Sequence, residues 1–299
     1  MTTLNTTLSI KMGSWLYHTG NRAEAALYGL KKQTLNLDGI HHKVWTSSNK
    51  NKPALLLIHG FSATHAVWLR FARHLTDKFY VIIPELAGHG QTGFEKHWDY
   101  SVPAQSARMI DLIHGLNITQ CHIAGNSMGG FIAAHMARTY PDACLSTVLI
   151  DPAGVISPQP SEMQIMLQRG ENPFFVSNQA DFDKFYSMTM AQPPFIPRLV
   201  LRALAVDYQQ RKEALKVIFS KYNQAEHYID KSETSIPCPT LLLWGAKDRL
   251  IDVSSVDVWQ RFFNGHTHIW DSLGHMPMLE APKDTAQTVM AFYRSQSLV

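Results

Sequence analysis

The chain has 299 residues, of which 45% are hydrophobic and 17% are charged, a composition of folded globular proteins and not of disordered or fibrous ones. Its 27 basic and 24 acidic side chains give a net charge of +3 without a long basic run, so nucleic acid is not an indicated partner. No apolar run reaches the roughly 18 to 20 residues that a membrane-spanning helix needs.

The N-terminal stretch carries a lysine inside its apolar part and lacks a secretory layout, so we expect a soluble, cytoplasmic protein. We expect an amphipathic segment from Trp15 to Leu30 to dock on the protein body, with peripheral membrane contact as the alternative. The cysteines Cys121, Cys144 and Cys238 lie far apart without CxxC spacing. This spacing predicts buried thiols, with neither a disulfide framework nor a metal site.

Strand-like runs and helical patterns alternate along most of the chain. The first two runs alternate apolar and polar residues, whereas most later ones are continuously apolar, as in parallel strands covered on both faces. The expected strands span 34–38, 42–47, 54–59, 80–84, 121–125, 147–151, 240–245 and 267–271, and the expected helices 65–76, 101–115, 128–139, 254–264 and 282–296. The alternation predicts an α/β protein with a mostly parallel eight-stranded sheet and helices on both faces.

Residues 154–232 break this rhythm. They contain helix-like segments, few strand signals and the proline-rich stretches "SPQP" (157–160) and "QPPFIP" (192–197). We predict that they form a helical cap, or lid, inserted into a core made of residues 1–153 and 233–299.

The sequence "GNSMGG" (125–130) lies between a predicted strand and a predicted helix. G-x-S-x-G in this context is typical of a nucleophile elbow, a strained turn that exposes a serine hydroxyl at the carboxyl edge of the sheet. Glycines two positions either side are expected because a side chain there would collide with the adjacent strand and helix. Ser127 is therefore the candidate nucleophile.

A serine hydroxyl needs a base, and the base needs an orienting acid, which on this scaffold follow the serine in the order acid, then histidine. Asp248 lies just beyond the carboxyl end of the strand 240–245, where ligands bind in such sheets, and is the preferred acid. Asp252, a candidate helix N-cap, and Asp151, at the end of the preceding strand, are the alternatives.

Of the fifteen histidines, only His266, His268 and His275 follow Asp248. His266 and His268 are two residues apart entering a predicted strand, where we expect edge or surface side chains. His275 follows the last predicted strand, in a loop that reaches the same edge of the sheet. His275 is therefore the candidate general base.

Acyl transfer also needs hydrogen-bond donors for the developing oxyanion. The backbone N–H of Met128, directly after the serine, is one candidate, and that of Phe61, in "HGFSA" (59–63), is the other. We expect His59 and His89 to hold their loops by hydrogen bonds.

These motifs occur together in a known order. On their combination the chain resembles the α/β-hydrolase superfamily, and most closely its monoacylglycerol lipase and lipase branch, over about residues 53–293. The resemblance implies a triad of Ser127, Asp248 and His275 and no cofactor. The motifs that carry it are "HGFSA" followed by Trp68, "GNSMGG", Pro152-Ala153-Gly154, "WGAKDRLID" (244–252) and "GHMPMLE" (274–280), whereas "ELAGHG" (85–90) departs from the commoner pattern at Glu85 and Ala87.

The predicted cap is rich in phenylalanine and methionine, which would suit an acyl chain, although most such side chains must form the cap's own core. We expect a lipid or other small-molecule ester of medium or long acyl chain, such as a monoacylglycerol. The candidate substrate-binding residues are Phe61, Met128, Phe174, Phe175, Phe185, Met188 and Met276. The oligomeric state is not indicated.

Two alternatives remain open. A carbon–carbon bond hydrolase of ring-cleavage dienoates would share "GNSMGG", but such enzymes usually have HGGG where this chain has "HGFS", and tryptophan where it has Met276. The dienoate would also need a cation, for which Arg169, Arg198, Arg202 and Arg211 are available, each expected at the surface. The other alternative is a non-catalytic ligand-binding protein on the same scaffold.

Overall fold

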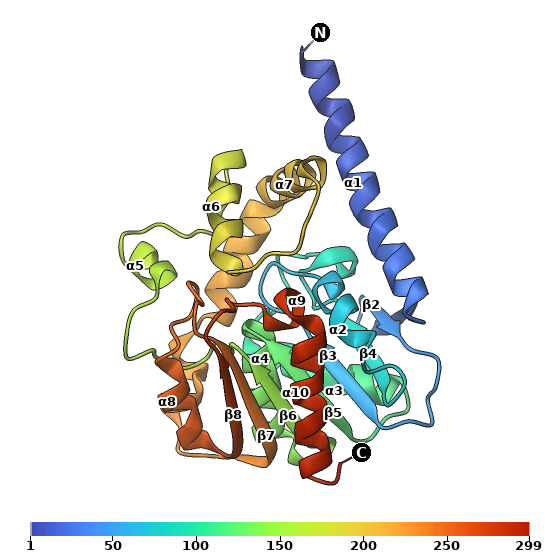
Figure 1. Ribbon diagram of the computed structural model, residues 1–299, viewed down its shortest axis with the longest axis vertical. Helices are drawn as coiled ribbons and strands as arrows, with labels where there is room; N and C mark the ends of the chain where they lie inside the picture. The colour runs from blue at the N-terminus through green and yellow to red at the C-terminus, as the bar shows by residue number, and fades with distance from the viewer. Residues whose placement is uncertain (1, 299) are drawn as a thin grey trace.

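The computed structural model describes residues 2–298, which form a central sheet with helices on both faces and a helical segment above one edge (Figure 1). The strands are β1 (Lys31–Leu37), β2 (Ile40–Thr46), β3 (Ala54–Ile58), β4 (Tyr80–Pro84), β5 (Cys121–Asn126), β6 (Cys144–Ile150), β7 (Ile236–Gly245) and β8 (Phe263–Trp270). Their order is β1-β2-β4-β3-β5-β6-β7-β8. The first two strands pair antiparallel with their neighbours and the other pairs are parallel, which confirms the predicted sheet.

The helices divide between the two faces of this sheet. The α-helices are α1 (Thr2–Leu27), α2 (Leu69–Ala72), α3 (Val102–Gly115), α4 (Met128–Thr139), α5 (Glu162–Gln168), α6 (Gln179–Thr189), α7 (Arg198–Tyr222), α8 (Ser255–Trp259), α9 (Pro277–Glu280) and α10 (Pro282–Ser295). The 3₁₀ turns are η1 (His65–Trp68), η2 (Gly90–Thr92), η3 (Pro141–Ala143), η4 (Ala225–His227), η5 (Ile229–Lys231) and η6 (Gln260–Phe262). Side chains of α3, α4 and α8 pack in one apolar cluster, and those of α2 and α10 in the other.

Strand β3 shows why a strand in the middle of this sheet has a continuously apolar sequence. Its side chains point alternately to opposite faces, so Leu56 and Ile58 join the cluster with α3 and α4, while Leu55 and Leu57 join the cluster with α2 and α10. All four are fully buried. A strand covered by helices on both faces has no position for a solvated side chain.

Between β6 and β7 the described chain contains helices and 3₁₀ turns but no strand (residues 154–232). The helix α5 begins at an N-cap, Ser161, whose hydroxyl accepts a hydrogen bond from Gln164 N, and α6 begins at Asn178 in the same way. Pro197 precedes α7. In Figure 1 these helices lie beyond the carboxyl ends of the parallel strands.

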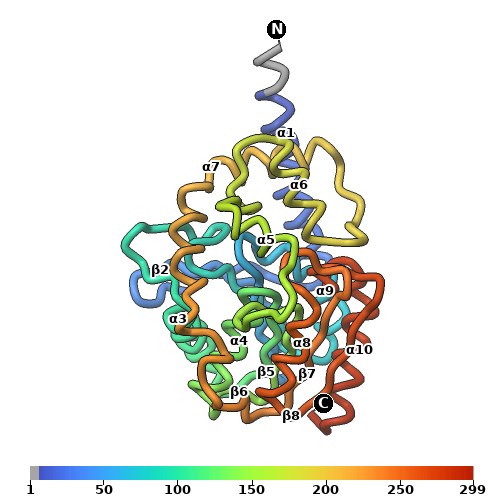
Figure 2. The backbone as a smooth tube through the Cα atoms, turned by 90° about the vertical axis from the view of Figure 1, so that its left-hand side faces the viewer, coloured from blue at the N-terminus to red at the C-terminus, as the bar shows by residue number. Residues whose placement is uncertain are grey.

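Helix α1 is longer than the amphipathic segment that we expected from the sequence. It extends beyond the body beside α7 in Figures 1 and 2. The two helices meet at Gly13, where a Cβ would lie 2.1 Å from Leu199 O, so only glycine allows this approach. Glu24 forms an ion pair with Arg70 at 2.9 Å near the base of the helix. Within residues 2–298, no helix combines the length and hydropathy that crossing a bilayer requires.

Two expected helices are shorter in the structure. The helix expected over 65–76 is the 3₁₀ turn η1 followed by α2, which ends at Ala72. The pattern over 254–264 predicted a single helix, but α8 ends at Trp259, η6 follows, and residues 263–264 already belong to β8. The apolar residues Phe262 and Phe263 fit a helix or a strand equally well, and pairing of Ile236 with Phe263 selects the strand. The three cysteines are free thiols, and Cys121 and Cys144 are buried.

Candidate active site

Ser127 occupies a strained turn between β5 and α4. Its φ of 57° and ψ of −122° lie outside the regions that side-chain-bearing residues favour. A Cβ on Gly125 would lie 2.1 Å from Gly129 O, and one on Gly129 would lie 2.2 Å from Ile58 O of β3. Both glycines are therefore required by close backbone contacts, as in the predicted elbow.

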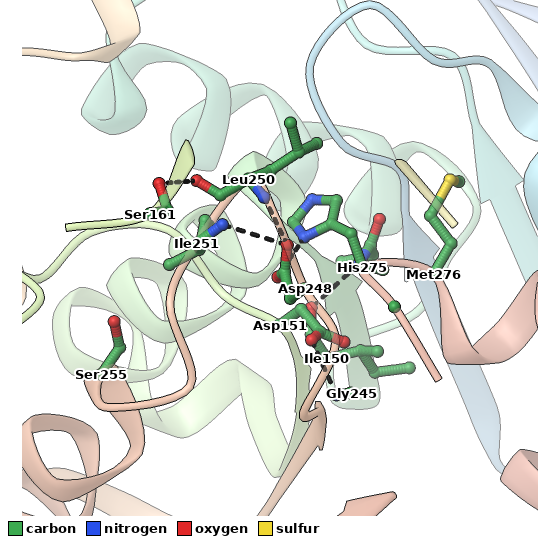
Figure 3. A network of polar contacts seen from close by, with 12 residues as sticks. Ile150, Asp151, Ser161, Gly245, Asp248, Leu250, Ile251, Ser255, His275 and Met276 are labelled. Carbon is green, nitrogen blue, oxygen red and sulfur yellow. Dashed lines mark hydrogen bonds and ion pairs between the residues drawn. The ribbon is translucent and has the colours of Figure 1, made fainter. Parts of the chain in front are cut away.

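Asp248 and His275 form a buried pair on the loops that follow β7 and β8 (Figure 3). His275 Nδ1 lies 2.6 Å from Asp248 Oδ2. The other oxygen, Asp248 Oδ1, accepts hydrogen bonds from Leu250 N at 2.7 Å and Ile251 N at 3.0 Å. These three contacts fix the orientation of the carboxylate toward the imidazole.

Two side chains that the sequence analysis did not single out hold the His275 loop. Asn126, beside the serine, donates its amide N–H groups to His275 O at 2.9 Å and Ile150 O at 3.1 Å. Glu280 accepts hydrogen bonds from Gly274 N at 3.0 Å and Met276 N at 3.2 Å. The loop is therefore anchored on both sides of the imidazole.

Glu280 also reaches the helical segment between β6 and β7. Its Oε2 accepts hydrogen bonds from Ala191 N at 2.8 Å and Gln192 N at 2.7 Å. One carboxylate therefore joins the His275 loop to the end of the α6 region. No sequence motif indicated this link, because the bonded positions are almost ninety residues apart.

Ser127 and His275 line the same cavity of about 640 Å³. In the described part of the chain no hydrogen bond joins their side chains. Unoccupied active sites often have long or poorly aligned catalytic hydrogen bonds that tighten when substrate binds. The structure thus brings together the pair Asp248–His275 and places Ser127 on the wall of the cavity that His275 also lines.

The two candidate oxyanion donors lie on either side of Ser127. Met128 is the first residue of α4, so its N–H has no acceptor within the helix. The loop with Phe61 abuts the elbow, since a Cβ on Gly60 would lie 3.1 Å from Ser127 Cβ. Within residues 2–298, neither N–H donates a hydrogen bond to another protein group. Both donors are available to an oxygen bound at the serine.

The cavity wall combines apolar and polar sides. Apolar side chains come from the segment between β6 and β7 and polar ones from the inner face of α1, including Tyr17 and Asn21. Of the candidate substrate-binding residues, Phe61, Phe174, Phe185 and Met276 line the cavity, whereas Met128, Phe175 and Met188 pack in the apolar core outside its wall. The polar side was not anticipated, because nothing in the sequence indicates that α1 folds back over the site.

The loop histidines behave as the sequence analysis expected. His59 Nδ1 lies 2.8 Å from Gly60 O, while its Nε2 accepts a hydrogen bond from Leu86 N at 3.1 Å. Burial lowers the pKa of His59 to about 4, so the ring is neutral at pH 7. His89 Nδ1 lies 3.2 Å from Ala87 O, and burial also lowers its pKa well below the usual range.

The alternative acids and bases lie in different surroundings. Asp252 accepts a hydrogen bond from Ser254 N at 2.9 Å, next to the start of α8. His266 and His268 lie exposed on β8. Asp151, in contrast, is fully buried beside Asp248. Asp151, Asp248 and His275 offer donor atoms within 4.8 Å of one another, a spacing that a metal ion could bridge, and in this structure His275 Nδ1 is hydrogen-bonded directly to Asp248 Oδ2.

A second imidazole–carboxylate pair lines the same cavity. His65 Nδ1 lies 2.7 Å from Glu85 Oε1, and both side chains are buried. The ring of His65 stacks on Trp45 with 3.4 Å between centroids, and Glu85 Oε2 accepts a hydrogen bond from Gln91 N at 2.5 Å. The sequence analysis noted Glu85 only as a departure from the usual motif and gave His65 no role.

Comparison with known proteins gives consistent results. A family model described as the α/β-hydrolase fold matches residues 53–282. Lipase 1 of Psychrobacter immobilis is 31% identical over 241 residues, which cover 80% of this chain and 76% of that protein. A monoacylglycerol lipase of Xenopus laevis is 27% identical over 257 residues, covering 82% and 76%. A solved structure of a bacterial membrane phospholipase A is 34% identical with a TM-score of 0.88, covering 96% of this chain and 93% of that one.

Proposed function

The chain belongs to the α/β-hydrolase fold family, and on that premise we propose that it is a serine hydrolase that cleaves carboxylic esters of medium or long acyl chains. Relatives named lipase and monoacylglycerol lipase support an ester substrate. We assign the catalytic roles to Ser127, Asp248 and His275. The observation that carries the assignment is the 2.6 Å contact of Asp248 with His275, which lines the same cavity as Ser127.

In the proposed reaction, His275 Nε2 takes the proton of Ser127 as its oxygen attacks the ester carbonyl carbon. Asp248 holds the Nδ1–H and stabilises the imidazolium, and the N–H groups of Phe61 and Met128 donate to the oxyanion. His275 then protonates the alcohol oxygen as the ester C–O bond breaks, which leaves the acyl group on the serine. A water molecule, deprotonated by His275, attacks the acyl carbon and releases the carboxylic acid and the serine hydroxyl.

The cavity supports a substrate with an apolar acyl chain. A volume of about 640 Å³ is within the range of drug-sized ligand sites. Phe174, Phe182 and Phe185 contribute an aromatic wall from the segment between β6 and β7. We assign residues 154–232 as a cap on a core of residues 1–153 and 233–299, and we expect the cap to set the preferred acyl length.

Peripheral contact with a lipid surface is part of this proposal. Leu8, Met12 and Trp15 are exposed by 66%, 50% and 61%, and their spacing puts them on one face of α1. The other face lines the cavity through Ser14, Tyr17 and other residues. One helix thus carries both an exposed apolar face and part of the cavity wall.

Of the four arginines considered for a dienoate in the carbon–carbon hydrolase alternative, one lines the cavity among the described residues. Arg211 lines the cavity, but its guanidinium lies 2.7 Å from Asp207 Oδ2 and is therefore already paired. Arg169, Arg198 and Arg202 do not belong to the cavity wall among the described residues. At Arg211 a dienoate carboxylate would therefore have to compete with Asp207. Arg22, Lys32 and Arg70 also line the cavity, so the dienoate assay described below has to decide between the two reactions.

Labelling with a fluorophosphonate tests the proposed nucleophile. The wild-type protein should label and Ser127→Ala should not, whereas absence of wild-type labelling would favour a non-catalytic ligand-binding protein. Hydrolysis of p-nitrophenyl esters of increasing chain length, compared with cleavage of a coloured dienoate, then separates the two reactions. Monoacyl, diacyl and triacyl glycerols in the same assay define the glyceride class.

A further inference from the structure

Asp151 lies directly against the proposed catalytic acid and has no role in the reaction described above. It follows β6, it is fully buried, and its backbone has a φ of +44°. Its Oδ1 accepts a hydrogen bond from Gly245 N at 2.9 Å, at the end of β7. Figure 3 shows its carboxyl group between Gly245 and Asp248. The chain thus tolerates an unfavourable backbone conformation and a buried acid at this position.

The surroundings of the two carboxyl groups differ in the number of donors. Asp248 receives hydrogen bonds from Leu250 N and Ile251 N and contacts His275 Nδ1. Asp151 receives only that of Gly245 N, and within residues 2–298 its Oδ2 has no donor. Two adjacent buried carboxylates cannot both carry a charge at a moderate cost. The proton therefore belongs on Asp151, which has fewer hydrogen-bond donors.

We propose that Asp151 is a neutral carboxylic acid whose O–H donates a hydrogen bond to the Asp248 carboxylate, and that it is a positioning residue for the Asp248–His275 pair. This inference rests on the proposed function, because it assigns Asp248 and His275 their catalytic roles. Burial first, and the charge of Asp248 second, raise the pKa of Asp151 well above its usual range. A protonated Asp151 gives its otherwise unpaired oxygen a bond and holds the Asp248 side chain at a second point besides its contact with His275.

The charged groups that face Asp151 come from three loops or helices. Asp248 lies on the loop after β7, His275 on the loop after β8 and Glu280 at the end of α9. Both carboxylates favour the protonated form of Asp151. If Asp151 were ionised instead, a second anion would lie near the imidazole and would stabilise the imidazolium of His275.

Replacing Asp151 by asparagine distinguishes a neutral carboxylic acid at this position from an ionised carboxylate. In Asp151→Asn the amide oxygen can still accept from Gly245 N, and the amide N–H can still donate to Asp248. Asparagine also tolerates a positive φ. The matched variant Asp151→Gly keeps the backbone conformation without strain but removes the donor.

The first measurement is the pH profile of kcat/KM on a p-nitrophenyl ester. We expect Asp151→Asn to keep the acidic limb within about 0.3 pH units of wild type, with kcat within about threefold. We expect Asp151→Gly to move that limb to higher pH and to lower kcat about tenfold, because Asp248 regains its full negative charge and loses its positioning. A shift of the limb to lower pH in Asp151→Asn would show that a negative charge was removed and would overturn the proposal.

A second measurement needs no catalytic activity, so it stands even if the proposed hydrolase function fails. The unfolded chain releases the Asp151 proton above pH about 4, whereas the folded chain keeps it. The folded state then binds more protons, so this group lowers the stability of the wild type as pH rises. The Tm of Asp151→Asn minus that of the wild type should therefore increase from pH 5 to pH 8. A difference that stays constant or decreases would contradict a neutral Asp151.

Discussion

Two buried imidazole–carboxylate pairs place their histidines on the wall of one cavity, which Ser127 also lines. His275 contacts Asp248 at 2.6 Å and His65 contacts Glu85 at 2.7 Å, so the contacts themselves are almost the same. Their surroundings differ. His275 is on a loop beyond the last strand with Ser127 on the same cavity wall, whereas the ring of His65 stacks on Trp45.

The carboxylates of the two pairs also bind different parts of the backbone. Asp248 accepts from Leu250 N and Ile251 N, within its own loop, and so is fixed as the acid behind the imidazole. Glu85 accepts from Gln91 N, and a Cβ on Gly90 would lie 2.3 Å from its carboxyl carbon, so it fastens the turn after β4. A histidine and a carboxylate in contact therefore do not define a catalytic site. A nucleophile within reach of the imidazole and donors for the oxyanion are also needed.

Replacing His275 and His65 in turn should give the largest difference in kcat between two variants. His275→Gln should lower kcat on a p-nitrophenyl ester by about a million-fold, because it removes the proposed general base. His65→Gln should keep kcat within about threefold, since its ring only stacks and bonds to Glu85. Steady-state kinetics on both variants, with Tm as a control for folding, test this. Comparable losses of kcat in the two variants would show that both pairs take part in the reaction.

Replacing the two carboxylates should change kcat in the same direction as replacing the two histidines, but with a smaller difference between the variants. Asp248→Asn should lower kcat about ten-thousand-fold, because the imidazole loses the partner that sets its tautomer and stabilises its charge. Glu85→Gln keeps the shape of the side chain, and we expect it to reduce stability by about 1–3 kcal/mol through weaker bonds to His65 and Gln91, with kcat within about threefold. Kinetics and urea unfolding of both variants are the measurements. Unchanged stability in Glu85→Gln would contradict a fastening role.

The imidazole of His59 shows how burial changes a histidine pKa when no carboxylate is hydrogen-bonded to the ring. Both ring nitrogens of His59 bond to the main chain, and burial lowers its pKa to about 4. The unfolded chain takes up a proton below about pH 6.5 while the folded chain does not, so stability is complete above pH 6.5 and decreases as pH falls toward 4. At full effect this one group costs about 3 kcal/mol.

The variant His59→Gln tests this predicted loss of stability at low pH. It should be less stable than the wild type at pH 8, because the bonds to Gly60 O and Leu86 N are altered. It should nevertheless lose less stability between pH 7 and pH 5, because no imidazole is left at this position to bind a proton. Urea unfolding at each pH gives the free energy of unfolding of both proteins. If this free energy falls with pH equally in the two proteins, His59 is ruled out as a source of the acid sensitivity.

The sequence predicted those parts of the molecule that depend on local patterns. The first two strands follow from alternating apolar and polar residues and most of the others from continuous apolar runs. The elbow follows from the two glycines around Ser127 whose Cβ atoms would collide with backbone. Asp248 and His275 followed from chain order and from their places after strands. Their catalytic roles remain predictions until the variants are measured.

The supports of the site could not be predicted, because they depend on contacts between distant positions. The amide of Asn126 bonds to His275 O across 149 residues, and no periodicity indicates such a pair. The apolar side chains of the segment 154–232 are equally hard to assign from the sequence. Phe185 lines the cavity and Met188 packs in the core, although both are buried side chains of α6. Composition predicts that such residues are buried, and only the packing decides which of them face a ligand.

Glu280 gives the smallest of the expected effects and tests whether the His275 loop needs its external support. Its carboxylate accepts hydrogen bonds from the loop, at Gly274 N and Met276 N, and from the segment between β6 and β7, at Ala191 N and Gln192 N. Glu280→Gln keeps one acceptor but turns an amide N–H toward the other set of donors. We expect kcat to fall about tenfold, because the imidazole is held less accurately while the acyl-binding wall is intact, so KM should change little.

The matched control for this variant is Glu226→Gln, on a cap side chain that is 73% exposed and only approaches His227 at 4.0 Å. We expect wild-type kinetics from it, because the same chemical change is made where no loop depends on the carboxylate. An equal loss of kcat in both variants would mean that the charge of the cap, and not the anchoring of the loop, is responsible. A normal kcat in Glu280→Gln would instead show that Asn126, on the other side of the imidazole, is sufficient to hold His275.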